Sequence, residues 1–213
     1  MNAQTQSLNL SGPAGAIEAL VDAPAPELFA APAGTAVIAH PHPQFGGTMT
    51  NKVVQTMARA FVQCGWRAVR FNFRGVGASA GTYDEGRGEL EDLLAVIDSQ
   101  APAAQPLALA GFSFGAFVTT QAVDRLWAAQ RPLASLVLVG TAVTRFAAAP
   151  IPSELHPQTL VIHGEQDDTV PLAAVMDWAR PQSLPVTVVP AGEHFFHGQL
   201  PLLKALVTRH VRV

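Results

Sequence analysis

The 213-residue chain has little cysteine and little basic charge. Its one cysteine, Cys64, cannot form an internal disulfide, which fits a reducing compartment. Thirteen Lys and Arg residues against sixteen Asp and Glu residues give a net charge of -3. No basic stripe is present, so the composition argues against nucleic acid as a partner.

Long hydrophobic runs are also missing. The longest apolar stretch, around residues 133–143, is well short of the roughly 18 residues that cross a bilayer. The first residues, MNAQTQSLNL, lack the basic start and apolar core of a secretory signal. Because no repeat, charge block or linker marks a boundary, we expect one domain over residues 1–213. We expect a soluble, cytoplasmic protein without a membrane span.

The apolar segments that are present alternate with helical patterns. Two short extended segments, 6–10 and 16–22, flank a Pro/Gly turn and predict an antiparallel hairpin. Nearly all-apolar strands are predicted at 35–40, 66–73, 106–111, 133–140, 158–164 and 184–190. Helices are predicted between them at 51–65, 88–100, 116–130, 171–182 and 198–211. This alternation indicates an α/β fold with a mostly parallel sheet covered by helices on both faces.

The segment GFSFG places a serine, Ser113, between two glycines. It follows an apolar strand and precedes a helix, which is the context of a nucleophile elbow. Gly111 and Gly115 would give the turn the space it needs beside the neighbouring strand and helix. The alternative reading is an ordinary tight turn, because the five-residue pattern also occurs by chance.

A serine nucleophile needs a histidine base and a carboxylate, in the chain order Ser, Asp or Glu, His. LVIHGEQDDTVP supplies carboxylates just after one strand, and VVPAGEHFFHG supplies histidines just after the next. The carboxyl ends of parallel strands meet at one edge of the sheet, so these groups are expected near Ser113.

The sequence resembles the α/β hydrolases, in particular small bacterial members without a cap. The resemblance covers nearly the whole chain and rests on five motifs in order: HPHP...FGG...NKVV, FNFRGVGAS, GFSFG, HGExDxxVP and GxHFFHG. It implies the α/β-hydrolase fold without a sizeable cap domain. It also implies Asp167 as the catalytic acid and His194 as the base.

Each assignment has a rival nearby. Asp168 could be the acid, although an aspartate there can also cap the helix expected near Pro171. His197 could replace His194, although it lies closer to the last helix and suits a local surface role. His163 ends an apolar strand, where a structural histidine is expected.

An oxyanion hole needs two amide donors. One is expected from Phe114, the residue after the serine, and the other from the loop HPHPQFGGTMTN. Its prolines have no amide hydrogen, which leaves His42, Gln44, Phe45 and Gly46 as candidates; the resemblance favours Phe45. His42, Gly46 and Phe112 are expected to contact the substrate, although the glycine also suits a plain turn and the aromatic ring also suits the core.

Arg74, in the FRGVGAS loop, is expected to brace the loops around the site through its fork of donors. Only about 17 residues separate the strands at 133–140 and 158–164, where larger relatives carry a lid. We therefore expect an open, shallow site for small acyl substrates.

The predicted function is a serine hydrolase that cleaves small carboxylic esters or thioesters through an acyl-enzyme, without metal or cofactor. A homo-oligomer is compatible with the sequence. Three alternatives are a non-catalytic binding protein with this fold, a peptidase, and a metal-dependent hydrolase using His40, His42, His163 and Asp167. No HExxH or similar spacing supports the metal site.

Overall fold

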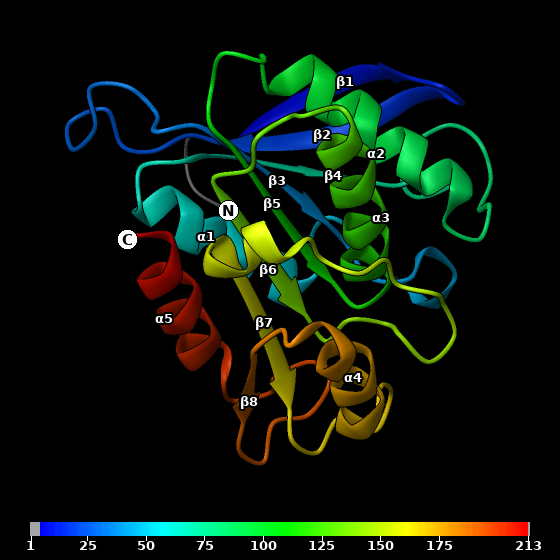
Figure 1. Ribbon diagram of the computed structural model, residues 1–213. Coiled ribbons are helices and arrows are strands. Elements are labelled where there is room, and N and C mark those ends of the chain that lie inside the picture. The colour runs from blue at the N-terminus through cyan, green and yellow to red at the C-terminus, as the bar shows by residue number, and fades with distance from the viewer. Residues whose placement is uncertain (1–4, 213) are drawn as a thin grey trace.

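The computed structural model describes residues 5–212, and a continuous eight-stranded sheet runs through its centre (Figure 1). The strand order is β1-β2-β4-β3-β5-β6-β7-β8. β1 pairs with β2 and β2 with β4 in antiparallel fashion, and all other pairs are parallel. The strands are β1 (Gln6–Gly12), β2 (Gly15–Asp22), β3 (Thr35–Ala39), β4 (Arg67–Phe71), β5 (Leu107–Phe112), β6 (Ser135–Val139), β7 (Thr159–Gly164) and β8 (Val186–Val189).

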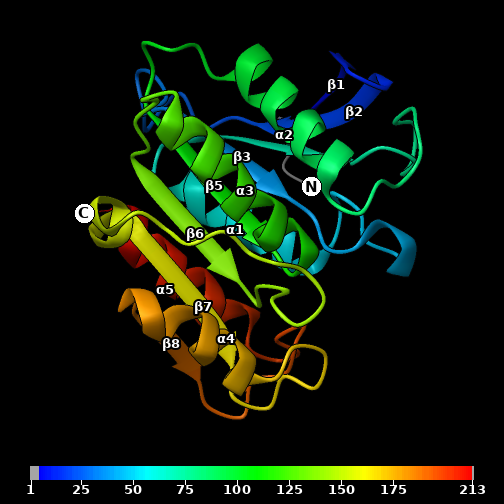
Figure 2. The same ribbon diagram turned by 45° about the vertical axis from the view of Figure 1, so that its right-hand side comes forward.

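Helices cover both faces of this sheet. α1 (Lys52–Gln63) and α5 (Leu200–Val211) pack on one face, and α2 (Arg87–Gln100), α3 (Phe114–Ala128) and α4 (Leu172–Ala179) on the other (Figure 2). Short 3₁₀ turns are η1 (Pro43–Phe45), η2 (Ser153–Gln158) and η3 (Arg180–Gln182). Every residue of β3, β5 and β6 is buried, as expected for strands covered on both sides. The predicted parallel sheet, two-sided helical cover and N-terminal hairpin are confirmed.

The order of the strands creates a crevice between β3 and β5. From β3 the chain moves outward to β4, and it then returns across β3 to β5, from which the remaining strands continue to the opposite edge. Ligands of open α/β sheets bind at such a reversal, outside the carboxyl ends of the strands. The loop after β3 and the turn after β5 therefore flank the same crevice.

Two elements end earlier in the structure than the sequence predicts, and local interactions explain both ends. The predicted strand 66–73 ends at Phe71, because the amides of Asn72 and Phe73 donate to the Glu18 carbonyl and the His40 ring. The predicted helix 171–182 stops at Ala179 and continues as η3, which contains a proline at its second position. The chain between β6 and β7 forms a loop and η2 only, so no cap covers the sheet edge.

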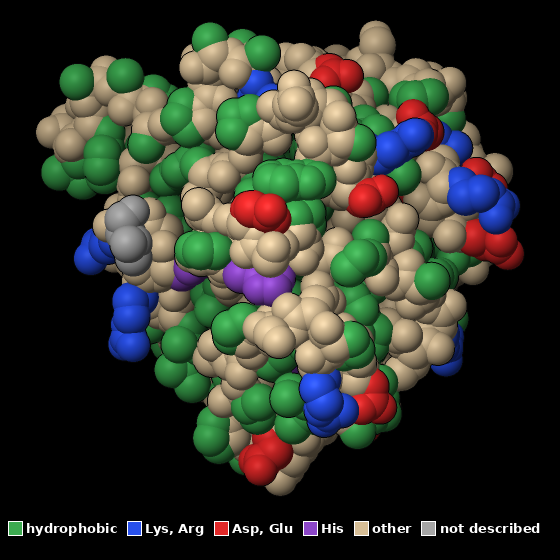
Figure 3. All heavy atoms as spheres, in the orientation of Figure 1, with side chains coloured by type: hydrophobic (Ala, Val, Ile, Leu, Met, Phe, Trp, Pro, Cys, Tyr) green, Lys and Arg blue, Asp and Glu red, His purple; other side chains and the backbone are tan. Residues whose placement is uncertain are grey.

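Charge is dispersed over the surface. On the face in Figure 3, acidic and basic side chains lie next to one another around α2 and again near α4, and no large patch of one sign is seen. Within residues 5–212, no helix combines the length and the hydropathy that a bilayer crossing requires.

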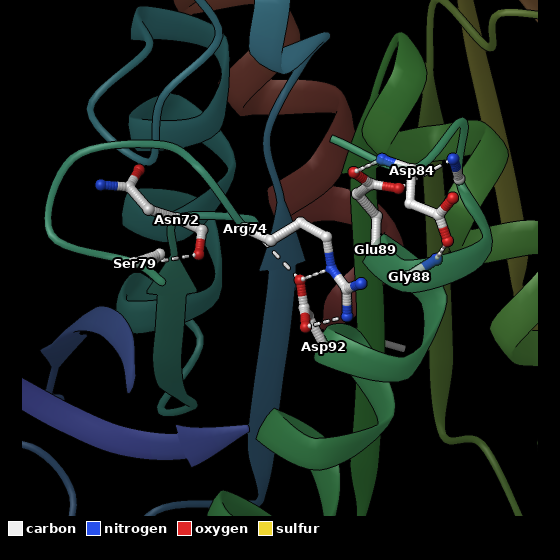
Figure 4. Close-up of polar contacts among 8 residues, drawn as sticks. Asn72, Arg74, Ser79, Asp84, Gly88, Glu89 and Asp92 are labelled. Carbon is white, nitrogen blue, oxygen red and sulfur yellow. Dashed lines mark hydrogen bonds and ion pairs between the residues drawn. The ribbon is translucent and has the colours of Figure 1, made fainter. Parts of the chain in front are cut away.

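The long connection between β4 and α2 is fixed by contacts of two buried carboxylates, those of Asp92 and Glu89 (Figure 4). The Arg74 guanidinium donates to both carboxylate oxygens of Asp92 on α2, at 2.8 and 2.9 Å, and its backbone amide donates to the same carboxylate. Glu89, fully buried, accepts from the amides of Asp84 and Gly86 at the start of α2. This agrees with the bracing role expected of Arg74.

We predict that Arg74→Met lowers the free energy of unfolding by about 3 kcal/mol, because it leaves the Asp92 carboxylate buried without its partner. The double variant Arg74→Met/Asp92→Leu should lose less free energy of unfolding than the two single variants lose together. Urea unfolding measures all three variants. Arg125→Met, which removes an exposed ion pair between α3 and Glu91 of α2, is the matched control and should change stability little. Additive single effects would contradict the prediction.

Candidate active site

Ser113 lies in a sharp turn between β5 and α3. Its backbone has φ 56° and ψ −116°, a conformation that residues with a side chain rarely adopt. A Cβ on Gly111 would approach the Gly115 carbonyl oxygen to 2.5 Å, and a Cβ on Gly115 would approach the Ala39 and His40 carbonyls equally closely. The glycines therefore allow α3 to begin in contact with β5 and β3, which turns Ser113 outward at the sheet edge.

The structure brings Ser113, His194 and Asp167 together in one hydrogen-bonded chain. The Nε2 atom of His194 is 3.0 Å from the Ser113 hydroxyl, and its Nδ1 atom is 2.7 Å from Asp167 Oδ2. All three side chains are buried. Since a carboxylate only accepts, Nδ1 carries the proton in neutral His194, and the Nε2 lone pair faces the serine.

The Asp167 carboxylate is held by the chain that follows it. Its Oδ1 atom accepts from the backbone amides of Thr169 at 3.0 Å and Val170 at 2.7 Å. The Nε2 atom of His163, also buried, lies 3.5 Å from Oδ2 and 2.8 Å from the Val170 carbonyl. Burial lowers the pKa of His163. Backbone donors thus orient the carboxylate toward His194.

The rival residues lie elsewhere. Asp168 is exposed and accepts from the Thr169 hydroxyl, and α4 has no side-chain cap, so the capping role considered for Asp168 is wrong. His197 is exposed and lies 3.1 Å from Glu193, one turn away, as a local surface residue would. His163 is a buried neighbour of the same Asp167 oxygen that His194 contacts, at the longer distance of 3.5 Å, and its Nε2 atom has a backbone partner in the Val170 carbonyl.

Phe112 corrects one expectation about substrate contact. Its side chain is fully buried and does not line the cavity at Ser113. The ring packs instead on His194, with 4.9 Å between ring centroids. Gly140, at φ 54°, leaves space beside the His194 ring, because a Cβ at position 140 would lie only 3.3 Å from Cε1 of His194. Phe112 therefore acts on the site by fixing the plane of His194.

A cavity of about 330 Å³ opens in front of Ser113. His42, Phe45 and Gly46 of the loop after β3 are among the residues that line it. The His42 ring packs on Phe114 and Tyr83, each at 4.9 Å between centroids. Burial, with a smaller contribution from the positive charge of Arg145, lowers the pKa of His42.

The loop after β6 also forms part of the cavity wall, which was not predicted from its sequence. Thr144, Arg145 and Phe146 line the cavity from this side. The signal was available in principle, because this loop also follows a parallel strand and so lies at the same sheet edge. The sequence could not show how far the loop folds back over it.

The loop between β3 and α1 carries the other predicted oxyanion donors. The Phe45 amide donates to the His42 carbonyl at 3.1 Å, and the Gln44 amide to the His42 ring at 3.2 Å. Within residues 5–212, no backbone acceptor is found for the His42 amide, and Gly46 follows the last residue of η1. The Phe114 amide is the first of α3 and therefore has no acceptor within the helix.

His40 fixes the start of this loop. Its Nδ1 atom donates to the Pro41 carbonyl at 2.6 Å, and its Nε2 atom accepts from the Phe73 amide at 3.0 Å. Burial lowers the pKa of His40 to about 4. Because both ring nitrogens are engaged by backbone groups, His40 is not free to act as the metal ligand that the alternative hypothesis needs. No group of three metal-binding side chains is found in the described part of the chain.

Comparisons with known proteins show the family and the fold to which this chain is similar. A family model described as "Serine aminopeptidase, S33" matches residues 30–157. An α/β serine hydrolase without a lid from Xanthomonas campestris is 38% identical, with a TM-score of 0.86 over 100% of this chain and 95% of that one. An α/β serine hydrolase homologue from Coxiella burnetii is 37% identical, with a TM-score of 0.80 over 97% of each chain. An uncharacterized protein of Rickettsia prowazekii is 33% identical over 76% of this chain and 71% of its own.

The open sheet edge, the serine turn and these similarities define the class as α/β hydrolases without a lid. The chain belongs to the α/β serine hydrolase family that the S33 model describes.

We predict that Ser113→Gly is about 1 kcal/mol more stable than Ser113→Ala, because glycine adopts the backbone conformation of this turn without strain. Both variants lack the hydroxyl, so their difference isolates the backbone. The matched control is Ser99, exposed within α2, where glycine should be about 1 kcal/mol less stable than alanine. Urea unfolding would contradict the prediction if both positions prefer alanine.

We predict that His40 makes the protein less stable as the pH falls from about 6.5 to about 4. In this range the unfolded state binds a proton at residue 40 and the folded state does not, so the free energy of unfolding falls with pH. The full loss is about 3 kcal/mol. Urea unfolding of wild type and His40→Gln at several pH values should show a shallower slope in the variant. Equal slopes would contradict the prediction.

Proposed function

We propose that this chain hydrolyses small carboxylic esters or thioesters through an acyl-enzyme. The observation that carries the proposal is the hydrogen-bonded chain in which His194 bridges Ser113 and Asp167, at 3.0 and 2.7 Å. Such a chain lets a neutral imidazole activate an alcohol that is otherwise a weak nucleophile. In this proposal Ser113 is the nucleophile, His194 the general base and acid, and Asp167 the residue that orients His194.

The first half-reaction follows from the placement of these atoms. The Ser113 hydroxyl oxygen attacks the substrate carbonyl carbon while His194 Nε2 takes the hydroxyl proton. The carbonyl π bond becomes a lone pair on oxygen, and the imidazolium is stabilised by the Asp167 carboxylate. The tetrahedral intermediate collapses, His194 returns the proton to the leaving alcohol or thiol, and the acyl group stays on Ser113.

Water completes the reaction. It enters as the leaving group departs, His194 takes one of its protons, and the resulting hydroxide attacks the acyl carbonyl. The second tetrahedral intermediate releases the carboxylic acid, and the proton on His194 returns to the Ser113 oxygen. The same groups thus act twice, in opposite order.

The negative oxygen of each intermediate needs amide donors. We assign one to Phe114, the first amide of α3. For the second, the Phe45 amide donates to the His42 carbonyl in this structure, whereas the His42 amide has no backbone acceptor within residues 5–212. Phe45 or Gly46 therefore serves only if η1 opens on substrate binding, whereas the His42 amide could serve without that change.

The size and polarity of the cavity support small acyl groups. About 330 Å³, walled by Phe45, Phe114 and Phe146, is enough for a short chain but not for a long lipid. The family model is described as an aminopeptidase, and such an enzyme must bind the ammonium group of a peptide. Arg145 is the only Asp, Glu, Lys or Arg side chain among the residues that line the cavity, so its charge opposes that ligand. An ester or thioester substrate is favoured.

The test combines a panel of p-nitrophenyl esters and acyl-CoA thioesters of graded chain length with labelling by a fluorophosphonate. We predict turnover of short acyl chains and labelling of the wild-type serine. Ser113→Ala should not be labelled and should lose about 10⁴-fold or more in kcat. His197→Gln, which changes a nearby exposed histidine, is the matched control and should retain both. Equal rates for wild type and Ser113→Ala would refute the hydrolase, and a protein that is folded but never labelled would support a binding function.

A further inference from the structure

Arg145 occupies the boundary between two hollows at the carboxyl edge of the sheet. It lies in the loop after β6 and is exposed. It lines the cavity at Ser113 and also a second, wider hollow of about 700 Å³. His42, Phe45, Arg145 and Phe146 line both, and we call these four residues the ridge. A substrate longer than the first cavity must pass the ridge to reach the second hollow.

The charge of Arg145 is not compensated by an acid. Within residues 5–212, no carboxylate oxygen lies within 4 Å of its guanidinium. The guanidinium carbon lies instead over the Phe45 ring, 5.8 Å from its centroid. Arg87, the other cation of the second hollow, differs because it pairs with Asp84 at 2.8 Å and Glu85 at 3.1 Å.

The field of Arg145 reaches the first cavity. Its positive charge is one cause of the lowered pKa of His42, after burial. That cavity has aromatic walls and contains no other charged Asp, Glu, Lys or Arg side chain. A planar guanidinium at the rim of such a space presents several donors to a carboxylate or phosphate and attracts anions more strongly than it would in open water.

We propose that the natural substrate carries an anionic group, a carboxylate or a phosphate, that pairs with Arg145 while the acyl carbonyl lies at Ser113. Arg145 is then a specificity-determining residue at the ridge, with the anion on the acyl part or on the leaving group. The aromatic contact with Phe45 holds the guanidinium in place before the substrate arrives. The inference rests on the proposed hydrolase function and adds no chemical step to it.

The test compares matched substrates that differ in charge. Mono(p-nitrophenyl) glutarate against p-nitrophenyl pentanoate places the anion on the acyl group. Para-acetoxybenzoate against its methyl ester places a carboxylate on the leaving group, and butyryl-CoA against the butyryl thioester of N-acetylcysteamine places phosphates there. For each pair, the measured quantity is the ratio of kcat/KM for the anionic member to that for the neutral member.

In at least one pair, Arg145→Gln should lower this ratio about threefold to tenfold, mainly through KM, because an exposed ion pair contributes modestly. The kcat/KM of the neutral member should fall less than that of the anionic member. Arg145→Lys should retain most of the ratio, since the charge remains. Arg209→Gln is the matched control: it removes an exposed cation from α5, lines neither hollow and should change nothing. Added salt should lower the wild-type ratio.

Two results would overturn the proposal. In the first, Arg145→Gln leaves the kcat/KM of every substrate unchanged. In the second, it slows the anionic and the neutral member of each pair equally, which would mean that Arg145 only packs on Phe45. Failure of the hydrolase itself looks different, because wild type would then act no faster than Ser113→Ala on any substrate. Calorimetric titration of glutarate and coenzyme A into Ser113→Ala and Ser113→Ala/Arg145→Gln gives a readout without turnover. We expect at least one of the two anions to bind more weakly to Ser113→Ala/Arg145→Gln than to Ser113→Ala. If neither does, the proposal is wrong, whether or not the protein is a hydrolase.

Discussion

The close contact of α3 with β3 and β5 is the constraint on which the site depends. It exists because Gly111 and Gly115 have no side chains at the points where three backbones meet. The same contact leaves Ser113 in a strained turn with its hydroxyl at the sheet edge. It also places the first amide of α3 beside the serine. One steric arrangement therefore sets both the position of the proposed nucleophile and that of one proposed donor to the negative oxygen.

Around that turn, three loops of the site are held by polar contacts of buried side chains rather than by a cap domain. His40 ties the loop after β3 to the start of the loop after β4. Arg74 and Asp92 tie that second loop to α2, and backbone amides hold Asp167 in the loop after β7. Buried polar groups are costly unless fully partnered, so each contact favours one loop conformation over its alternatives. The open sheet edge can thus remain ordered without a lid.

The sequence was sufficient for those features that depend on patterns along the chain. Buried apolar strands alternating with helices predict the parallel sheet, and GFSFG predicts the turn, because both depend on local sterics. Asp167 and His194 follow consecutive parallel strands, so topology alone brings them to the edge where Ser113 lies. The choice of Asp167 over its neighbour Asp168 came from the resemblance to the α/β hydrolases. A shift of one residue along the loop decides which carboxylate faces His194, and the sequence alone does not fix that shift.

Side-chain direction and loop path were beyond the sequence. Phe112 was expected at the substrate, yet alternation along β5 turns it under His194. Arg145 was not predicted to belong to the site, because it lies in the loop after β6, which has no periodic sequence pattern. It lines the cavity only because that loop folds back over it. That loop occupies the place where larger relatives carry a lid. A lid selects substrates by enclosing them, whereas a short loop can select only through the few groups it presents at the rim. With one uncompensated cation among them, charge rather than shape is the property that such an open site can distinguish.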